Sequence, residues 1–191
     1  MTGFHTLAQT EQAVQDRLGG MSLDFDAMLA ISNIHRAATA IRHHLEDSIL
    51  REAELTWTGF VVLWVIWVWG EMEAGNVAAE AGISKGTLTG VVKTLQSRDL
   101  VERGGDPGDG RVVRLRLTRG GEKLMRRLFP DVNREEVFLV DTLEQRDTKA
   151  LGRGLRKVVL HLEEHGEARR TELRAGMPAA RRSGGRRSAA G

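Results

Sequence analysis

The chain contains no cysteine among its 191 residues. Without thiols, disulfide scaffolds, thiolate zinc sites, iron–sulfur clusters, cysteine nucleophiles and thiol redox sensing are all excluded. Proline is also rare, occurring only at positions 107, 130 and 178, so long stretches are free to be helical. These absences favour a mainly helical protein whose function does not depend on sulfur chemistry.

Long hydrophobic runs are lacking as well. The longest, FVVLWVIWVW at residues 60–69, falls short of a membrane span, which needs about 18 apolar residues or more. The first 20 residues are polar and lack the apolar core of a secretory signal. We therefore expect a cytoplasmic protein with no membrane anchor, in which residues 60–69 form a buried helix.

A net charge of +2 conceals an uneven distribution of charge. Residues 85–127 contain 11 Lys and Arg against 5 Asp and Glu, residues 174–191 contain 5 Arg and no acid, and the remainder is acidic. A concentrated basic segment can neutralise phosphates and release counterions, as nucleic-acid-binding proteins do. A solvated charged face would give the same composition, so the motifs have to decide.

Hydrophobic spacing predicts a series of helices. Apolar residues recur every three or four positions, the period of a helix with one buried stripe. Thr56 and Ser84 are suited to N-caps, and Gly82 suits a left-handed residue that ends a short helix. We expect helices near residues 1–20, 24–52, 55–69, 74–81, 85–98 and 119–129, and two more within 131–165.

After residue 98 the period changes from helix to strand. Residues 100–103 form a short apolar and charged strand, residues 104–110 are dense in turn-forming Gly, Asp and Pro, and apolar residues alternate with arginines over 113–117. This pattern predicts a β-hairpin. The order helix, short helix, turn, helix, strand, turn and strand is that of a winged helix-turn-helix, which binds duplex DNA.

Within this motif the helix that begins at Lys85 is expected to enter the major groove by its N-terminal end. The hairpin tip carries Arg111, which can enter the narrow minor groove, while the Asp109 carboxylate, which phosphate would repel, supports the turn. Lys93, two turns into the helix, either contacts phosphate or faces solvent. The predicted DNA-contacting residues are Ser84, Lys85, Gly86, Thr87, Thr89, Lys93 and Arg111.

Several motifs follow one another in a fixed order. They are Leu55-Thr56-x3-Phe60, Ala81-Gly82-Ile83-Ser84-Lys85-Gly86-Thr87-Leu88-Thr89, Leu95-x4-Leu100-Val101-x-Arg103 and Asp106-x2-Asp109-x-Arg111-x3-Leu115-x-Leu117-Thr118. Together they resemble the multiple-antibiotic-resistance regulator (MarR) family over residues 24–165. One departure lies in the wing, where Gly108 and Gly110 flank Asp109, whereas the family often has arginine there.

The resemblance implies a homodimer held by its first and last helices, bound to a pseudo-palindromic operator and usually acting as a repressor released by a small ligand. The expected fold is mainly α with a small β-hairpin wing. We expect an N-terminal extension at 1–20, a helical dimerisation domain at 21–54 and 130–170, a winged helix-turn-helix at 55–129 and a basic disordered tail at 171–191.

A ligand pocket is expected between the dimer helices and the DNA-binding lobe. The tryptophans at 57, 64, 67 and 69 are predicted to be mostly core, because a helix that is apolar on all sides is buried. Trp57 and Trp64 could still line such a pocket, with His35 or Arg42 as the polar partner of a small aromatic or anionic effector. Histidine protonation is a second way to control the protein.

An enzyme is the first alternative. The string Gly82-Ile83-Ser84-Lys85-Gly86 satisfies G-x-S-x-G, the nucleophile motif of serine hydrolases. That motif requires a strand before the serine, whereas residues 77–81 have a helical pattern. Ser84 serves better as an N-cap, so we expect no catalysis.

A metal sensor is the second alternative. His43 and Asp47 are four positions apart on the predicted helix 24–52 and could share one zinc ion. His35, His44 and Glu46 lie on the same helix, but adjacent histidines face different sides of it. Exposed surface histidines are the better explanation of this spacing, so we expect neither a metal nor a cofactor.

The third alternative is an architectural protein that coats DNA without ligand control. Its arginine tail would supply sequence-independent affinity that weakens steeply with salt. Removing residues 174–191 would then abolish most binding, whereas a sequence-specific regulator would keep its operator.

Overall fold

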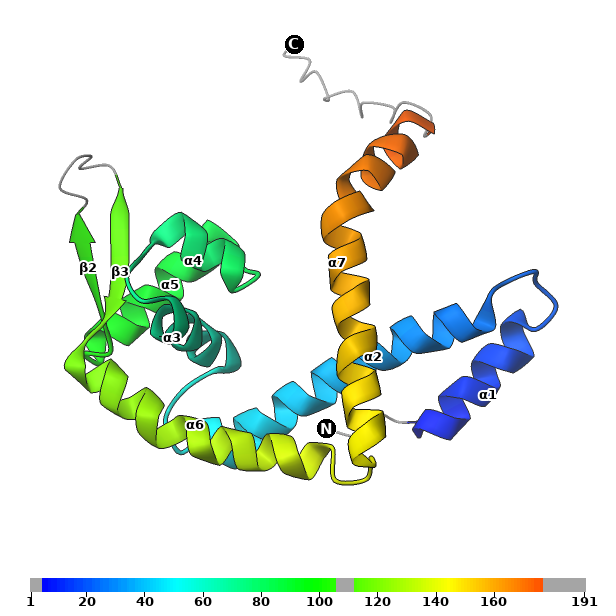
Figure 1. The fold of residues 1–191 in the computed structure, drawn as a ribbon, viewed down its shortest axis with the longest axis horizontal. Coiled ribbons are helices and arrows are strands. Elements are labelled where there is room, and N and C mark those ends of the chain that lie inside the picture. The colour runs from blue at the N-terminus through cyan, green and yellow to red at the C-terminus, as the bar shows by residue number, and fades with distance from the viewer. Residues whose placement is uncertain (1–4, 106–111, 177–191) are drawn as a thin grey trace, which may run out of the picture. The chain divides into compact units, whose positions relative to one another are not determined.

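A computed structural model describes residues 5–105 and 112–176. These residues divide into two compact units, one ending at Leu139 and one beginning at Val140. Figure 1 traces the elements in chain order. They are α1 (Leu7–Leu18), α2 (Phe25–Leu45), the π-helical turn η1 (Glu46–Leu50), α3 (Trp57–Trp69), β1 (Met72–Glu73), α4 (Ala74–Glu80), α5 (Lys85–Ser97), β2 (Val101–Gly105), β3 (Val113–Leu117), α6 (Arg119–Leu139) and α7 (Gln145–Gly176).

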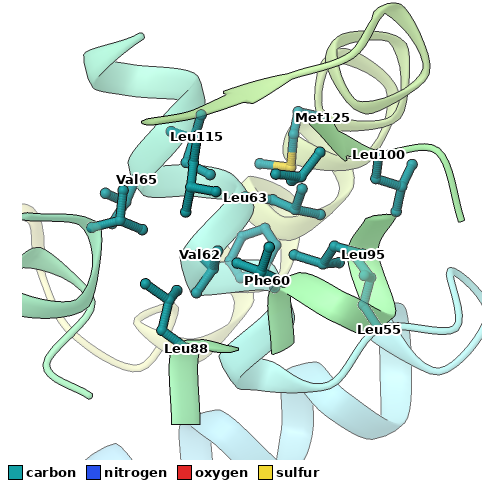
Figure 2. Packing of buried hydrophobic residues seen from close by; sticks show 14 of the residues in the cluster. Leu55, Phe60, Val62, Leu63, Val65, Leu88, Leu95, Leu100, Leu115 and Met125 are labelled. Atoms are coloured by element: carbon teal, nitrogen blue, oxygen red, sulfur yellow. The ribbon is translucent and has the colours of Figure 1, made fainter. Parts of the chain in front are cut away.

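Helix α3 is the centre of the core in the first unit. It contacts α4, α5, α6 and β3, and its Leu63 is fully buried. Figure 2 shows Leu63 among Leu115 of β3, Met125 of α6 and Leu95 of α5. Thr56 caps α3 as predicted, since its hydroxyl accepts a hydrogen bond from the Gly59 backbone at 3.1 Å. The fold is mainly helical with a small antiparallel sheet, as the sequence predicts.

The prediction that the tryptophans are mostly core holds for two of the four, because Trp57 and Trp67 are half-buried and pack against the core. All four lie on α3 and all are at least partly exposed, with 39% of Trp64 and 64% of Trp69 accessible. Helix α3 buries one face, which carries Phe60, Val62, Leu63, Val65 and Ile66, and leaves much of its opposite face open. The apolar pattern could not reveal this, because it is the same on both faces.

The sheet has three strands in the order β1-β3-β2. The predicted hairpin pairs β2 with β3 in a register that places Val101 opposite Leu117 and Gly105 opposite Val113. On its other edge β3 pairs with the two residues of β1, which lie just before α4. Strand β1 was not predicted, because its two residues are too few to show a period.

Helix α6 differs from the prediction of a helix ending near residue 129. It continues through Pro130 to Leu139. Proline lacks an N–H and crowds the carbonyl one turn back, yet Leu128 and Val132 on either side of it are buried in the core. Their packing holds the helix together across the proline.

The helix predicted over 24–52 is continuous but not uniform. Asp24 caps it by accepting a hydrogen bond from the Ala27 backbone at 2.9 Å. At its end it widens into η1, where the Arg51 backbone donates to Glu46 five residues earlier at 3.0 Å. Glu54 then takes a left-handed φ of 52° and turns the chain toward α3.

In the second unit α7 extends to Gly176, so residues 171–176, assigned to the disordered tail above, are helical. Ion pairs extend along this end, between Arg169 and Glu172 at 2.5 Å and between Arg170 and Glu167 at 2.7 Å. Such pairs three residues apart support a helix whose composition is poor in apolar residues.

A search of the helices over 5–105 and 112–176 for a segment able to cross a bilayer finds none with the required length and hydropathy.

Candidate nucleic-acid interface

The turn between α4 and α5 has the geometry of a helix-turn-helix. Gly82 adopts a φ of +64°, which favours glycine. The backbone of Gly82 donates to Ala79 at 3.1 Å, and that of Ile83 donates to Ala78 at 3.0 Å. Buried Ala78 and Leu88 anchor the two helices to the core. The turn therefore presents the N-terminal end of α5 at a fixed angle to α4.

Ser84 is the N-cap of α5. Its backbone is extended, and its hydroxyl accepts a hydrogen bond from the Thr87 backbone at 3.0 Å. The same oxygen lies 2.9 Å from the Thr87 hydroxyl. The segment before Ser84 is helix α4 rather than a strand, so the nucleophile geometry of a serine hydrolase is not formed.

Helix α5 has one buried and one exposed face. Leu88, Val92 and Leu95 are buried as predicted, while Val91 is only half-buried. The Thr89 hydroxyl donates to the Lys85 carbonyl at 3.0 Å, so its oxygen can still accept a hydrogen bond. The exposed face carries all the predicted contact residues of this helix: Lys85, Gly86, Thr87, Thr89 and Lys93, with Ser84 at its start.

A cavity of about 360 Å³ is lined by residues of α5, of both hairpin strands and of β1. Lys85 and Thr89 line it from the helix, Arg103 from β2, and Glu73 from β1. The exposed Arg103 thus adds a second cation beside the N-terminal end of α5. Arg103 was not among the predicted contact residues, because strand alternation places it on the same face as the buried Val101.

The two hairpin strands β2 and β3 are paired as far as Gly105 and Val113, next to the expected tip. Gly104 pairs with Arg114 and Gly105 with Val113, and Glu102 forms an ion pair with Arg116 across the strands at 2.8 Å. The predicted wing residues Asp109 and Arg111 lie outside the described residues.

The four predicted ligand-binding residues are spread over two helices. His35 and Arg42 are exposed on α2, and the Arg42 guanidinium is 3.4 Å from the His43 ring. The Trp57 backbone donates to the Glu46 carboxylate at 2.9 Å. Trp64 lies two turns further along α3. The contacts found for Arg42 and Trp57 join them to neighbours outside the predicted set.

The histidines and acids of the metal alternative have other partners. His44 lies 2.5 Å from the Glu135 carboxylate of α6 and stacks on Phe138 with ring centroids 5.6 Å apart. Asp47 pairs with Arg51 on its own helix. Over 5–105 and 112–176, His, Cys, Asp and Glu side chains form no group of three or more that could hold a metal ion.

Comparisons with known proteins agree with this geometry. The sequence model of the MarR family matches residues 55–113. The uncharacterized HTH-type transcriptional regulator YwaE of Bacillus subtilis is 32% identical over 141 residues, which cover 74% of this chain and 82% of YwaE. These relatives are transcriptional regulators rather than enzymes.

Two solved structures have similar folds. BpsR of Bordetella bronchiseptica, whose DNA binding is regulated by 6-hydroxynicotinic acid, is 25% identical with a TM-score of 0.64, covering 69% of this chain and 98% of that one. Sco3205 of Streptomyces coelicolor, a MarR family regulator in complex with DNA, is 25% identical with a TM-score of 0.66, covering 74% and 91%.

Replacing Ser84 with alanine removes the cap of α5 and should lower the free energy of unfolding by about 1 kcal/mol, measured by urea denaturation. Ser84→Asp restores an acceptor and should stay within about 0.5 kcal/mol of the original protein. An alanine variant as stable as the original, or labelling of Ser84 by a fluorophosphonate, would contradict the capping role.

Proposed function

Because the chain belongs to the MarR family of DNA-binding transcriptional regulators, we propose that it is a homodimeric repressor that occupies a pseudo-palindromic operator and is released by a small ligand. The observation that carries this proposal is the exposed polar face of α5, presented on a capped N-terminal end beside a basic hairpin. Its site of action is the cytoplasm, where such a regulator meets DNA.

The DNA contacts are proposed from exposure and chemistry. Lys85 supplies a cation, Gly86 an uncovered backbone, and Thr87 and Thr89 hydroxyls that can donate or accept at base edges. Lys93 reaches phosphate one to two turns further along the helix. We assign Arg111 to the minor groove and Asp109 to support of the wing, as the family resemblance implies.

The homodimer is proposed from the exposed apolar stripe of α7. Leu151, Leu155, Val158 and Leu162 follow one another at intervals of four, three and four residues, and each is at least 38% exposed. A helix stripe of this kind requires an apolar partner, and a second copy supplies the same stripe. The dimer helices lie within 21–54 and 130–170, and the two recognition helices enter successive major grooves about one helical turn apart.

The effector is proposed to be a small aromatic or anionic molecule. Exposed Trp64 and half-buried Trp57 supply aromatic surface on α3, and the polar side chains of His35 and Arg42 are exposed on α2. Such a ligand releases the operator only if it binds the DNA-free conformation more tightly. BpsR, whose DNA binding responds to 6-hydroxynicotinic acid, supports this ligand class.

The architectural function remains the second candidate, favoured by the five arginines in residues 174–191. The two proposals differ in sequence dependence. A selection of random duplexes by the purified protein at physiological salt should enrich a palindrome. Binding without enrichment, lost on removal of residues 174–191, would establish the architectural function in its place.

On the enriched operator, Lys85→Ala should weaken binding by about tenfold and lower the salt slope by about one unit, because one phosphate or base contact is lost. Thr87→Ala should reduce the preference over random DNA, and Arg111→Ala should weaken binding chiefly at A·T-rich flanks. Fluorescence anisotropy over a range of salt measures all three.

The matched control for these variants is Lys149→Ala, which removes the same charge from an exposed position on α7. It should leave operator affinity within about twofold, since Lys149 is outside the proposed set of DNA-contacting residues. Unchanged affinity in Lys85→Ala, Thr87→Ala and Arg111→Ala together would eliminate this recognition surface.

Leu155→Glu places a charge in the α7 stripe and should convert the dimer to a monomer of 21.1 kDa, measured by light scattering during gel filtration. The control Leu160→Glu changes an exposed leucine on the opposite side of the same helix and should remain dimeric. Equal behaviour of both variants would place the dimer interface elsewhere.

Titration with aromatic carboxylic acids should quench tryptophan fluorescence and release the operator over the same concentration range. Trp64→Phe should weaken this response by about tenfold through loss of aromatic contact, while Trp69→Phe, at the exposed last residue of α3, should retain it. Operator release without any change in fluorescence would move the effector site away from Trp57 and Trp64.

A further inference from the structure

The C-terminal end of α5 is bound to the end of the α2–η1 helix by a single arginine. Arg98 follows the last residue of α5, and its guanidinium donates to the carbonyl of Glu54 at 2.5 Å and to that of Ala53 at 2.8 Å. The Glu54 carboxylate is 3.7 Å away. Only 26% of the Arg98 side chain is exposed. We call this set of contacts the Arg98 clamp.

The carbonyls that Arg98 binds are the ones that a helix end leaves without partners. Residues 51–54 form the turn after η1, and Glu54 takes a left-handed φ of 52°, which is costly for a residue other than glycine. The carbonyl end of a helix carries partial negative charge, so a nearby cation stabilises it. Arg98 thereby stabilises the turn whose shape directs the chain from η1 into α3.

Both side-chain packing and the Arg98 clamp join α5 to the segment that leads into α3. A cavity of about 360 Å³ lies between α5 and the start of α3, lined by Glu54, Thr56 and Gly59 on one side and by Gly90, Thr94 and Arg98 on the other. Leu55 and Leu95, which also line this cavity, are buried in the common core, and the Arg98 guanidinium adds a polar bridge between the same two segments. Its two parallel hydrogen bonds fix an angle as well as a distance.

The next residue, Asp99, connects the end of α5 to the start of α6. Asp99 also takes a left-handed φ, of 53°, and its carbonyl accepts a hydrogen bond from the Thr118 hydroxyl at 2.5 Å. At the start of α6, a Cβ on Gly121 would lie 2.1 Å from the Leu100 carbonyl oxygen, so only glycine permits this approach. The end of α5 is therefore held on one side to η1 and on the other to α6.

We infer that Arg98 is a positioning residue that sets the direction of the recognition helix relative to α2 and α6, and with it the half-site spacing that the dimer accepts. This inference rests on the proposed function, in which two copies present their α5 helices to one operator. Arg98 is 13 residues from Lys85, or about 20 Å along a helix at 1.5 Å per residue.

A rotation of about 10° at the clamp would displace Lys85 by about 3.4 Å, which equals one base-pair step. Small angular freedom at Arg98 thus becomes a change of spacing at the DNA. The loss of the clamp should relax the spacing preference, while each recognition helix keeps its own contacts with a half-site.

The test uses Arg98→Ala with three kinds of duplex: the enriched operator, operators whose half-site spacing is changed by one or two base pairs, and a single half-site. Affinity for the operator should fall by about tenfold, as expected for the loss of charge-assisted hydrogen bonds. Affinities for all spacings should come within about twofold of one another, and half-site affinity should change by less than about twofold.

The matched control is Arg51→Ala, which removes the same charge from the turn after η1. Arg51 pairs with Asp47 and is 75% exposed, so its variant should keep the spacing preference. Arg98→Lys keeps the charge but cannot span two carbonyls with a planar fork, and it should lose part of the preference. If circular dichroism shows that Arg98→Ala is unfolded, Arg98→Lys alone tests the inference.

The inference would be overturned if the unsubstituted protein prefers one half-site spacing and the Arg98 variants keep that preference. The proposed function would then still stand. Equal loss of half-site and operator affinity would also overturn it, since a general loss of structure has that effect. If the unsubstituted protein binds no operator specifically, both the proposed function and this inference fail. This outcome is recognised before any substitution is made.

Discussion

The burial of one face of α3 is the constraint on which the rest of the first unit depends. Leu63 and its neighbours on that face contact β3, α4, α5 and α6, so four elements from separate parts of the sequence take their positions from one helix. Each buried aliphatic side chain there contributes about 1.5–3 kcal/mol through the hydrophobic effect. The recognition helix lies on this support, with Leu88, Val92 and Leu95 inward and its hydroxyls and lysines outward.

Local signals in the sequence were sufficient for the helix-turn-helix. Gly82 and Ser84 act within three or four residues of themselves, so a turn and a cap can be recognised without tertiary information. The hairpin was equally predictable, because its alternating apolar residues and its turn residues are adjacent in the chain. The predicted contacts on α5 followed from the helix period once its inner face was known.

Contacts between distant residues account for what the sequence did not reveal. The two residues of β1 are a strand only because β3 lies beside them, and α6 passes Pro130 because the core holds both sides of it. The exposure of Trp64 depends on which face of α3 the other elements cover. Arg98 donates to backbone carbonyls 44 and 45 residues earlier in the chain. Since every residue type has the same backbone carbonyl, no side-chain pattern in the sequence indicates this contact.

The capped first turn of α5 has a thermodynamic consequence. The hydroxyls of Ser84, Thr87 and Thr89 already have partners within the helix, and these side chains therefore have little rotamer freedom left to lose when DNA binds. Ordering a mobile side chain at an interface costs about 0.5–1.5 kcal/mol. A surface organised in advance avoids that entropy loss, so the release of counterions and water makes up a larger part of the net driving force for binding.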